Sequence, residues 1–310
     1  MKKLSSFIFG ACYITVCTCG FLLPMQAQQD NSQNRLEDAI RQLSGENVRG
    51  YVQPFMNGVG ANLNSGWYNT ADISDVGFHF RLQVIGMGTL IGDADKTYYA
   101  VPPQPLDQTP VETATLFGDR GTTVNGPGGT TYQFQNGQVK TNILPAATLQ
   151  LTVGNIFGTQ AIIRYLPPDV RYLFSYKGDD FPKTTFFGIG ARHSVSRYLP
   201  SSPIDLAGGF FYQKLTIGDI MEAKALIFGG QVSKSFSVLT LYGGLQYETS
   251  TLTLSYTNST TNAIVNTEID GENHIRATAG LTLNLVILNL NADVSIGKVT
   301  VLSCGLSFGM

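Results

Sequence analysis

The last part of the chain, from Asn273 to Met310, alternates in twos between apolar and polar residues. The apolar set contains Ile275, Ala277, Ala279, Leu281, Leu283 and Leu285, then Leu288, Leu290, Ala292, Val294 and Ile296, then Leu302, Cys304, Leu306 and Phe308. A period of two is the period of a β-strand. The pattern therefore predicts three antiparallel strands with one apolar and one polar face. Either water or lipid can border such a sheet, so the rest of the chain has to decide between them.

Composition favours a membrane that is crossed by strands. Charged residues make up only 14% of the chain, whereas soluble domains carry roughly 25%. After the first thirty residues no run is long and apolar enough for a membrane helix. In hydrocarbon only helices and closed barrels satisfy every backbone polar group. The fold predicted for the chain is therefore all-β, a transmembrane antiparallel β-barrel.

The amino terminus has the features of a secretory signal peptide, predicted to span residues 1–27. Lys2 and Lys3 precede an apolar run, and Ala27 is a small residue at the expected cleavage site. The alternatives are an uncleaved anchor helix and a lipoprotein that uses Cys17 or Cys19. Cleavage would leave one of the four cysteines, Cys304, and would exclude an internal disulfide. It would also lower the formal net charge from −2 to −4 by removing two lysines, so no nucleic-acid partner is expected.

Residues 28–71 are predicted to form a periplasmic helix followed by a plug-like segment. Asn34-x-x-Glu37 resembles a capping box, and apolar residues recur at helical spacing as far as Leu43. Residues 51–71 are rich in glycine and asparagine and follow neither period, which favours a compact irregular segment. Trp67, Tyr68 and Asn69 within it are the candidates for a plug or gate.

Residues 72–310 are assigned to the barrel. Strand-like runs cover residues 78–84, 149–156, 158–166, 170–177, 185–198, 204–218, 222–234 and 236–256, and from Ile264 the chain returns into the three C-terminal strands. These runs give about 12 strands, an even number as barrels of this class require, with 14 as the alternative. Residues 92–145 are predicted to be a long loop with a small hairpin at Asn136-Gly137. If the last strand ends in the periplasm, this loop faces outward and the amino-terminal helix is periplasmic.

Polar residues on the alternate positions of these strands are the expected lining of the lumen. The lumen-facing candidates are His79, Arg81, Tyr242, Glu248, Arg276 and Asp293. Their apolar neighbours in sequence are then assigned to lipid, and Cys304 is assigned to the lipid side with Leu302 and Leu306.

No catalytic, metal-binding or cofactor-binding motif is predicted. The three histidines show no ligand spacing, and no G-x-S-x-G nucleophile elbow occurs. His193 and Ser194 are adjacent on a predicted strand and so point to opposite faces, which prevents direct cooperation. We therefore expect no enzyme, no metal and no cofactor.

Five stretches resemble an uncharacterised family of predicted outer-membrane barrel proteins from Gram-negative bacteria. They are GVGANLNSGWYNTA, LFGDRG, FGTQAIIRYLP, FFGIGARHSVSRYLP and DLAGGFFYQKLTIGD. The resemblance implies a barrel in the outer membrane and no particular activity. More distantly, the segment before the first strand is similar to the plug of FadL-type hydrophobic-compound transporters, although Asn69-Thr70-Ala71 stands where that family has Asn-Pro-Ala.

The leading hypothesis is passive or facilitated passage of a small solute, apolar by the FadL resemblance, through a lumen gated by residues 51–71. The alternative is a structural or surface-binding barrel that uses the loop 92–145 and transports nothing. An enzyme is a third class that no constellation of residues supports. Outer-membrane lipid and a small-molecule solute are the expected partners, and the solute and the oligomeric state stay open.

Overall fold

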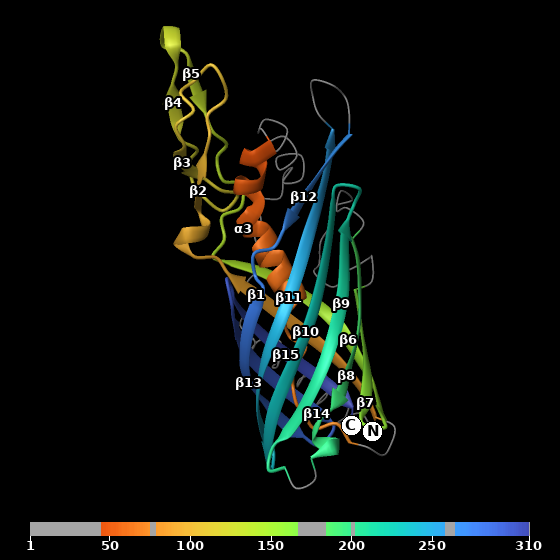
Figure 1. The fold of residues 1–310 in the computed structure, drawn as a ribbon. Helices are drawn as coiled ribbons and strands as arrows, with labels where there is room; N and C mark the ends of the chain where they lie inside the picture. Colours follow the sequence, from red (N-terminus) through yellow and green to blue (C-terminus); the bar gives the residue numbers. More distant parts are fainter. Residues whose placement is uncertain (1–44, 75–78, 167–183, 200–201, 258–263, 310) are drawn as a thin grey trace, which may run out of the picture.

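The computed structural model describes residues 45–74, 79–166, 184–199, 202–257 and 264–309 (Figure 1). The predicted signal peptide and the predicted helix that ends at Leu43 lie outside the described residues. Within the described part of the chain, no helix is long and apolar enough to span a membrane.

One α-helix and eleven strands make up the main body. They are α3 (Gly45–Leu63), β1 (His79–Leu90), β6 (Ile143–Ile156), β7 (Thr159–Leu166), β8 (Thr184–Ser194), β9 (Asp205–Ile217), β10 (Met221–Phe236), β11 (Leu239–Thr257), β12 (Ile264–Asp270), β13 (Ile275–Leu285), β14 (Leu288–Ile296) and β15 (Thr300–Gly309). A one-turn 3₁₀ helix at Ser196–Tyr198 lies between β8 and β9.

Ten of these strands close into an antiparallel barrel. The order is β10-β9-β8-β7-β6-β1-β15-β14-β13-β11, and β11 pairs back onto β10. The predicted closed β-barrel and its three C-terminal strands are therefore confirmed. Two-residue connections join β6 to β7, β10 to β11 and β13 to β14 at one end, where Phe157, Ser237 and Val286 adopt positive φ. We call this the short-turn end and the opposite one the long-loop end.

The predicted count of twelve strands is wrong, because the closed ring has ten and one further strand lies outside it. The run 170–177 lies outside the described residues, and β7 pairs directly with β8, so no strand stands between them. The run that begins at residue 264 is β12, which pairs with residues 251–257 of β11 beyond the ring. The lower half of β11 pairs instead with β13. One long strand therefore has two successive neighbours on the same side.

The polarity of the wall reverses along β10. From Leu226 to Val232 its outward residues are uncharged, with Phe228 exposed, while the inward Gln231 is polar and buried. Near the long-loop end the outward Lys224 forms an ion pair with Glu222 on the surface, and the inward residues are apolar. Toward the short-turn end the outward Lys234 ends the uncharged stretch. From residue 226 to 232 this stretch measures about 20 Å along the strand, or roughly 15 Å along the barrel axis at the usual tilt.

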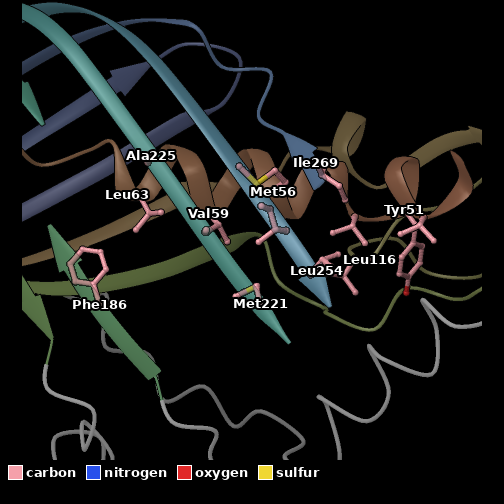
Figure 2. Packing of buried hydrophobic residues seen from close by; sticks show 14 residues of the cluster. Tyr51, Met56, Val59, Leu63, Leu116, Phe186, Met221, Ala225, Leu254 and Ile269 are labelled. Carbon is pink, nitrogen blue, oxygen red and sulfur yellow. The ribbon is translucent and has the colours of Figure 1, made fainter. Parts of the chain in front are cut away.

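The helix α3 covers the apolar inner face at the long-loop end. Its buried side chains Val48, Tyr51, Val52, Met56, Val59 and Leu63 recur at helical spacing. Facing them are Ala223 and Ala225 of β10, Leu252 and Leu254 of β11, and Ile269 of β12 (Figure 2). Burial of this one face, at about 25 cal/mol per Å² of apolar area, is what holds the helix in place.

The prediction of an irregular segment from residue 51 to 71 is wrong for its first half, which belongs to α3. Pro54, Gly58 and Gly60 lower the helix propensity of this stretch. Both glycines are required by close packing. A Cβ on Gly58 would lie 2.8 Å from Cδ2 of Leu144, and one on Gly60 would overlap the side chain of Ser250. Tertiary packing therefore overrides local propensity here.

The predicted long loop folds into an arm beside α3 at the long-loop end (Figure 1). Its short elements are η1 (Asp93–Asp95), β2 (Thr97–Ala100), β3 (Val111–Ala114), β4 (Thr123–Asn125), η2 (Pro127–Gly129) and β5 (Thr131–Gln133). The strands pair as two hairpins, β2 with β3 and β4 with β5. The predicted hairpin at Asn136-Gly137 is wrong, because the second hairpin turns near residue 128 and Gly137 instead donates to the carbonyl of Asp119.

The arm is bonded to α3. The amide of Leu116 donates to the carbonyl of Tyr51 at 3.0 Å, and the Tyr51 hydroxyl donates to the carbonyl of Asn136 at 2.8 Å. Burial raises the pKa of Tyr51, which keeps this hydroxyl protonated as a donor. The arm and the helix share one end of the barrel. The predicted periplasmic helix ends at Leu43 and lies outside the described residues, so the position of α3 does not test it.

Candidate functional site

Residues 61–71, which we call the inner segment, run from the last turn of α3 along the inside of the barrel. Most of its side chains are buried, including Asn64, Ser65, Trp67 and Asn69. Gly66 in its middle adopts φ +68°, a conformation that glycine reaches without strain. The inner segment therefore carries the chain from the helix toward the start of β1 through the space that the ten strands enclose.

Three buried arginines from the wall hold the inner segment through its backbone carbonyls. Arg164 of β7 donates to the carbonyl of Ser65 at 2.9 Å. Arg276 of β13 donates to the carbonyl of Ala61 at 3.0 Å and to the hydroxyl of Ser65. In the ring, β7 and β13 are five places apart out of ten, so they lie on opposite sides. Ser65 is thus bonded to opposite walls at once.

The third arginine bonds to the inner segment further along the chain, at Asn69 and Thr70. Arg192 of β8 donates to the carbonyl of Thr70 at 3.0 Å and to Oδ1 of Asn69 at 3.2 Å. On the far side, the hydroxyl of Thr282 on β13 donates to the carbonyl of Asn69 at 2.7 Å. The segment is therefore bonded across the lumen at two successive levels.

The charges of these arginines are balanced to different degrees. Arg276 and Glu248 form an ion pair at 2.8 Å with both side chains almost fully buried, and Glu248 also accepts from Gln246 at 3.0 Å. Arg164 and Arg192 instead bond neutral acceptors, Gln150 and Gln160, at 2.9 and 2.8 Å. A buried ion has a desolvation cost of several kcal/mol, which these hydrogen bonds only partly offset. The interior therefore carries an excess of positive charge around the segment.

The structure places the three predicted gate residues inside the lumen. Trp67 stacks on Phe211 of β9 with ring centroids 4.0 Å apart, and the guanidinium of Arg164 lies 3.5 Å from the centroid of the Trp67 ring. Tyr68 packs against Gly229 and Gly244, where an added Cβ would overlap its ring or hydroxyl. These contacts pack the two aromatic rings against neighbouring strands of the wall, β9 for Trp67 and β10 and β11 for Tyr68, within one apolar cluster.

The six predicted lumen-facing residues fall into two groups. Four belong to the buried network, since the hydroxyl of Tyr242 donates to Asp293 at 2.9 Å and Glu248 pairs with Arg276. The other two, His79 and Arg81 of β1, lie nearer the short-turn end and line a cavity there. The side chains of the first group bond to other protein groups, whereas those of the second group line a cavity.

That cavity, which we call the vestibule, has a volume of about 310 Å³. Its lining is mostly polar: Thr70, Asp72, Ser74, His79, Arg81, Thr152, Gln160, Ser235, Thr240, Asn284, Val286, Asn289 and Gly309. Thr70 belongs to both the inner segment and the vestibule, so the segment forms the inner limit of this space.

Several buried polar atoms near the segment have no hydrogen-bond partner among the described residues. They include Nε1 of Trp67, the hydroxyl of Tyr68, both polar atoms of the Gln231 side chain and Oδ1 of Asp293. Buried polar groups are nearly always satisfied, by ordered water where no protein group is in reach. The lumen around the segment is therefore expected to be hydrated. In the part of the chain that the structure describes, no cluster of three or more potential metal ligands occurs.

The sequence analysis missed Arg164 and Arg192, which donate hydrogen bonds to the inner segment, and Ser65, which accepts them within it. A signal for the arginines is present, since Gln160, Ile162 and Arg164 occupy alternate, inward positions of β7. A charged residue at an inward position of an apolar strand indicates a buried polar partner. Ser65 carries no such signal, because its bonds come from strands distant in the sequence.

Comparison with known proteins adds the family and few details. No curated protein matches the chain in sequence. Among solved structures, Ail, the attachment invasion locus protein of Yersinia pestis, is 12% identical with a TM-score of 0.25, covering 74% of this chain and 97% of its own. The outer-membrane protease OmpT from Escherichia coli is 7% identical with a TM-score of 0.30, covering 76% and 99%. A mutant of the Rh. blastica porin is 11% identical with a TM-score of 0.13, covering 74% and 100%.

These three are outer-membrane-type barrels, and at such scores the likeness does not extend to activity. The strand pairing and burial described above support the ten-stranded ring, its outward apolar band and its polar interior. A family model matches the sequence over residues 1–310. The chain belongs to the family of unknown function DUF6588.

Proposed function

We propose that this protein is a channel of the Gram-negative outer membrane that is closed at rest by the inner segment and passes a small polar solute when that segment moves. The observation that supports this most directly is the bonding of Ser65 to Arg164 and Arg276 from opposite walls. Residues 61–71 act as the plug, and Trp67, Tyr68 and Asn69 fill the cross-section at its middle.

The chemistry of the plug suits reversible movement. Its bonds to the wall run largely from backbone carbonyls to arginine and glutamine side chains, as where Gln246 donates to the carbonyl of Asn64 at 3.1 Å. Water can replace such partners, and each bond contributes roughly 0.5–1.5 kcal/mol net, or about 1.5–3 kcal/mol where an arginine takes part. Their sum keeps the closed state dominant. Opening then requires a ligand or force that favours the open state by several kcal/mol.

The lining of the lumen favours a polar solute over the apolar one that the FadL resemblance implied. Gln83, Gln150 and Gln213 are buried and face inward next to the plug. An apolar molecule would have to strip water from these amides and leave them unpaired, at roughly 1–3 kcal/mol for each group.

A reversible crosslink tests the gate. The hydroxyls of Thr70 in the plug and Ser233 on β10 are 3.3 Å apart, so cysteines at both positions are close enough for a disulfide. The background is a chain whose four native cysteines are replaced by serine. Single-channel recording in a planar bilayer should show rare openings that oxidation of Thr70→Cys/Ser233→Cys abolishes and reduction restores.

The controls are the two single-cysteine chains, which should not respond to oxidant. If openings persist in the oxidised double variant, solute does not pass by movement of residues near Thr70. If neither redox state nor any plug variant ever conducts, the protein is not a channel.

The alternative function, a surface-binding barrel, is favoured by one observation. The arm is folded rather than loose, since Thr122 donates to the carbonyl of Glu112 at 2.6 Å and Phe134 donates to the carbonyl of Thr122 at 3.0 Å. Deleting residues 97–133 should abolish partner binding and leave permeability unchanged if this reading is right. Loss of gating in the same deletion would favour the channel.

A further inference from the structure

The vestibule contains an arginine that differs from the other three of the interior. Arg164, Arg192 and Arg276 each donate to several acceptors. Nε of Arg81 is buried yet has no hydrogen-bond partner among the described residues. One nitrogen of Arg164 and one of Arg276 are also without a partner among those residues, but their other nitrogens are bonded. A buried guanidinium N–H that is left unused is costly. Among the described residues, the Arg81 side chain therefore has an unused donor at the wall of the vestibule.

The charges around Arg81 favour an anion. Asp72 attracts it through space, without a hydrogen bond between the two side chains. Arg192 lies close enough to repel it. Asp72 is the one carboxylate among the residues that line the vestibule in the described structure, and its side chain is exposed. Arg81 thus lines the vestibule beside one exposed carboxylate, and Arg192, buried behind the lining, adds a second positive charge nearby.

The remaining lining supplies neutral hydrogen-bonding groups around the same space. The vestibule is also lined by Thr152, Asn289 and His79, whose hydroxyl, amide and ring nitrogen groups all offer hydrogen-bond donors. A planar fork plus neutral donors is the arrangement that recognises carboxylate or phosphate oxygens. The cavity, of about 310 Å³, has room for such an ion together with water.

We propose that the vestibule is a binding site for a small free oxyanion, of the carboxylate or phosphate class, with Arg81 as its principal donor. The inference deepens the proposed channel function, on which it rests, by naming the class of solute. Binding itself needs only the closed structure, because the vestibule lies outside the plug. Failure of the conductance test would leave anion binding in place, and failure of anion binding would leave the gate in place.

The test is isothermal titration calorimetry of the folded chain in a non-ionic detergent without lipid, with inorganic phosphate and then succinate as the probes at fixed ionic strength. The wild type should give a saturable heat. Arg81→Gln should weaken binding by about tenfold or more, as the loss of charged hydrogen bonds implies. Arg81→Lys should retain more affinity than Arg81→Gln, because it keeps the charge and loses the fork.

The matched control is Arg197→Gln. Arg197 lies in the 3₁₀ helix at the same end and faces Phe157, outside the vestibule, so the variant removes the same charge and should bind like the wild type. Heat-modifiable migration of each variant verifies that its barrel is folded. The absence of a saturable heat in the wild type overturns the proposal. Equal weakening in Arg81→Gln and Arg197→Gln overturns it too, because it would indicate attraction by net charge alone. If Arg81→Gln does not fold, Arg81→Lys provides the test. An affinity of Arg81→Lys equal to that of the wild type would then contradict a bidentate site.

Discussion

Arg164 and Arg276 bind the same residue, Ser65, from opposite sides of the barrel. Arg164 uses the carbonyl of Ser65 and Arg276 uses its hydroxyl. Because the two guanidiniums approach along opposite directions, neither can follow the segment if it moves toward the other wall. Ser65 is therefore hydrogen-bonded to two strands that lie on opposite sides of the ring.

The ion pair of Arg276 with Glu248 gives a stability prediction. Replacing Arg276 with methionine leaves Glu248 buried without its partner, which should lower the free energy of unfolding by about 3–5 kcal/mol. Urea unfolding of the folded barrel, followed by the loss of heat-modifiable migration, measures the change. The double variant Arg276→Met/Glu248→Leu should recover part of the loss. A double variant as unstable as the sum of the single changes would contradict the view that the lone charge is responsible.

The reversal of polarity along the wall predicts where a charge is tolerated. Leu245 on β11 is outward and exposed within the apolar band, so Leu245→Arg should cost about 2–4 kcal/mol if it lies near the middle of the bilayer. Thr253 on the same strand and face pairs with Glu222, beyond that band, so Thr253→Arg should be close to neutral. Folding yields into lipid vesicles, compared between the two variants, test this. Equal yields would mean that the band is misplaced.

The close approach of α3 to β11 predicts a repairable defect. Gly60→Ala places a methyl group onto the side chain of Ser250, which should loosen the helix and raise its rate of amide hydrogen exchange. Ser250→Gly in the same chain removes the obstructing atoms and should restore protection. Hydrogen exchange with mass spectrometry reads peptides from residues 45–63 directly. If Ser250→Gly rescues nothing, the helix must be held at a greater distance from the wall.

Trp67 provides a direct probe of the inner segment, because it is the one tryptophan of the chain. It is 2% exposed, so acrylamide should quench its fluorescence weakly in the folded barrel. Arg164→Gln removes both the stacked cation and the bond to Ser65, and should increase quenching several-fold. Arg197→Gln, which removes an arginine outside the lumen, should leave quenching unchanged. Strong quenching of the wild type would place Trp67 in water and contradict the packed plug.

The alternation of apolar and polar residues along the strands was sufficient to predict the class of fold. Ile275 faces outward and Arg276 inward as the period of two predicts, because each strand of a barrel separates two different environments along its whole length. The number of strands did not follow, since it depends on pairing. β12 has the pattern of a wall strand, yet its partner region on β11 lies above the ring, and nothing local distinguishes the two cases.

The candidate site was predictable in part. Trp67, Tyr68 and Asn69 were chosen for their aromatic and amide chemistry in a glycine-rich stretch, and the structure places them in the lumen. The helix before them was missed because the glycines and asparagines of residues 51–71 indicate an irregular segment, whereas the helix is stabilised by packing against distant strands. The arginines that hold the inner segment act through backbone carbonyls, which every residue has. The sequence therefore does not indicate which backbone carbonyl a distant guanidinium will bond.

The apolar docking of α3 sets the length of chain that is free to move. Sliding the helix would expose Met56 and Val59 to water together with the wall that they cover, whereas moving the residues beyond Leu63 would break their hydrogen bonds and the stacking of Trp67 on Phe211. In the proposed channel, the fixed point of any movement would therefore be Leu63, and Gly66, with its positive φ, would be the residue best able to change backbone conformation. A gate of this length would stay inside the lumen, so its own length would limit the width of the opening.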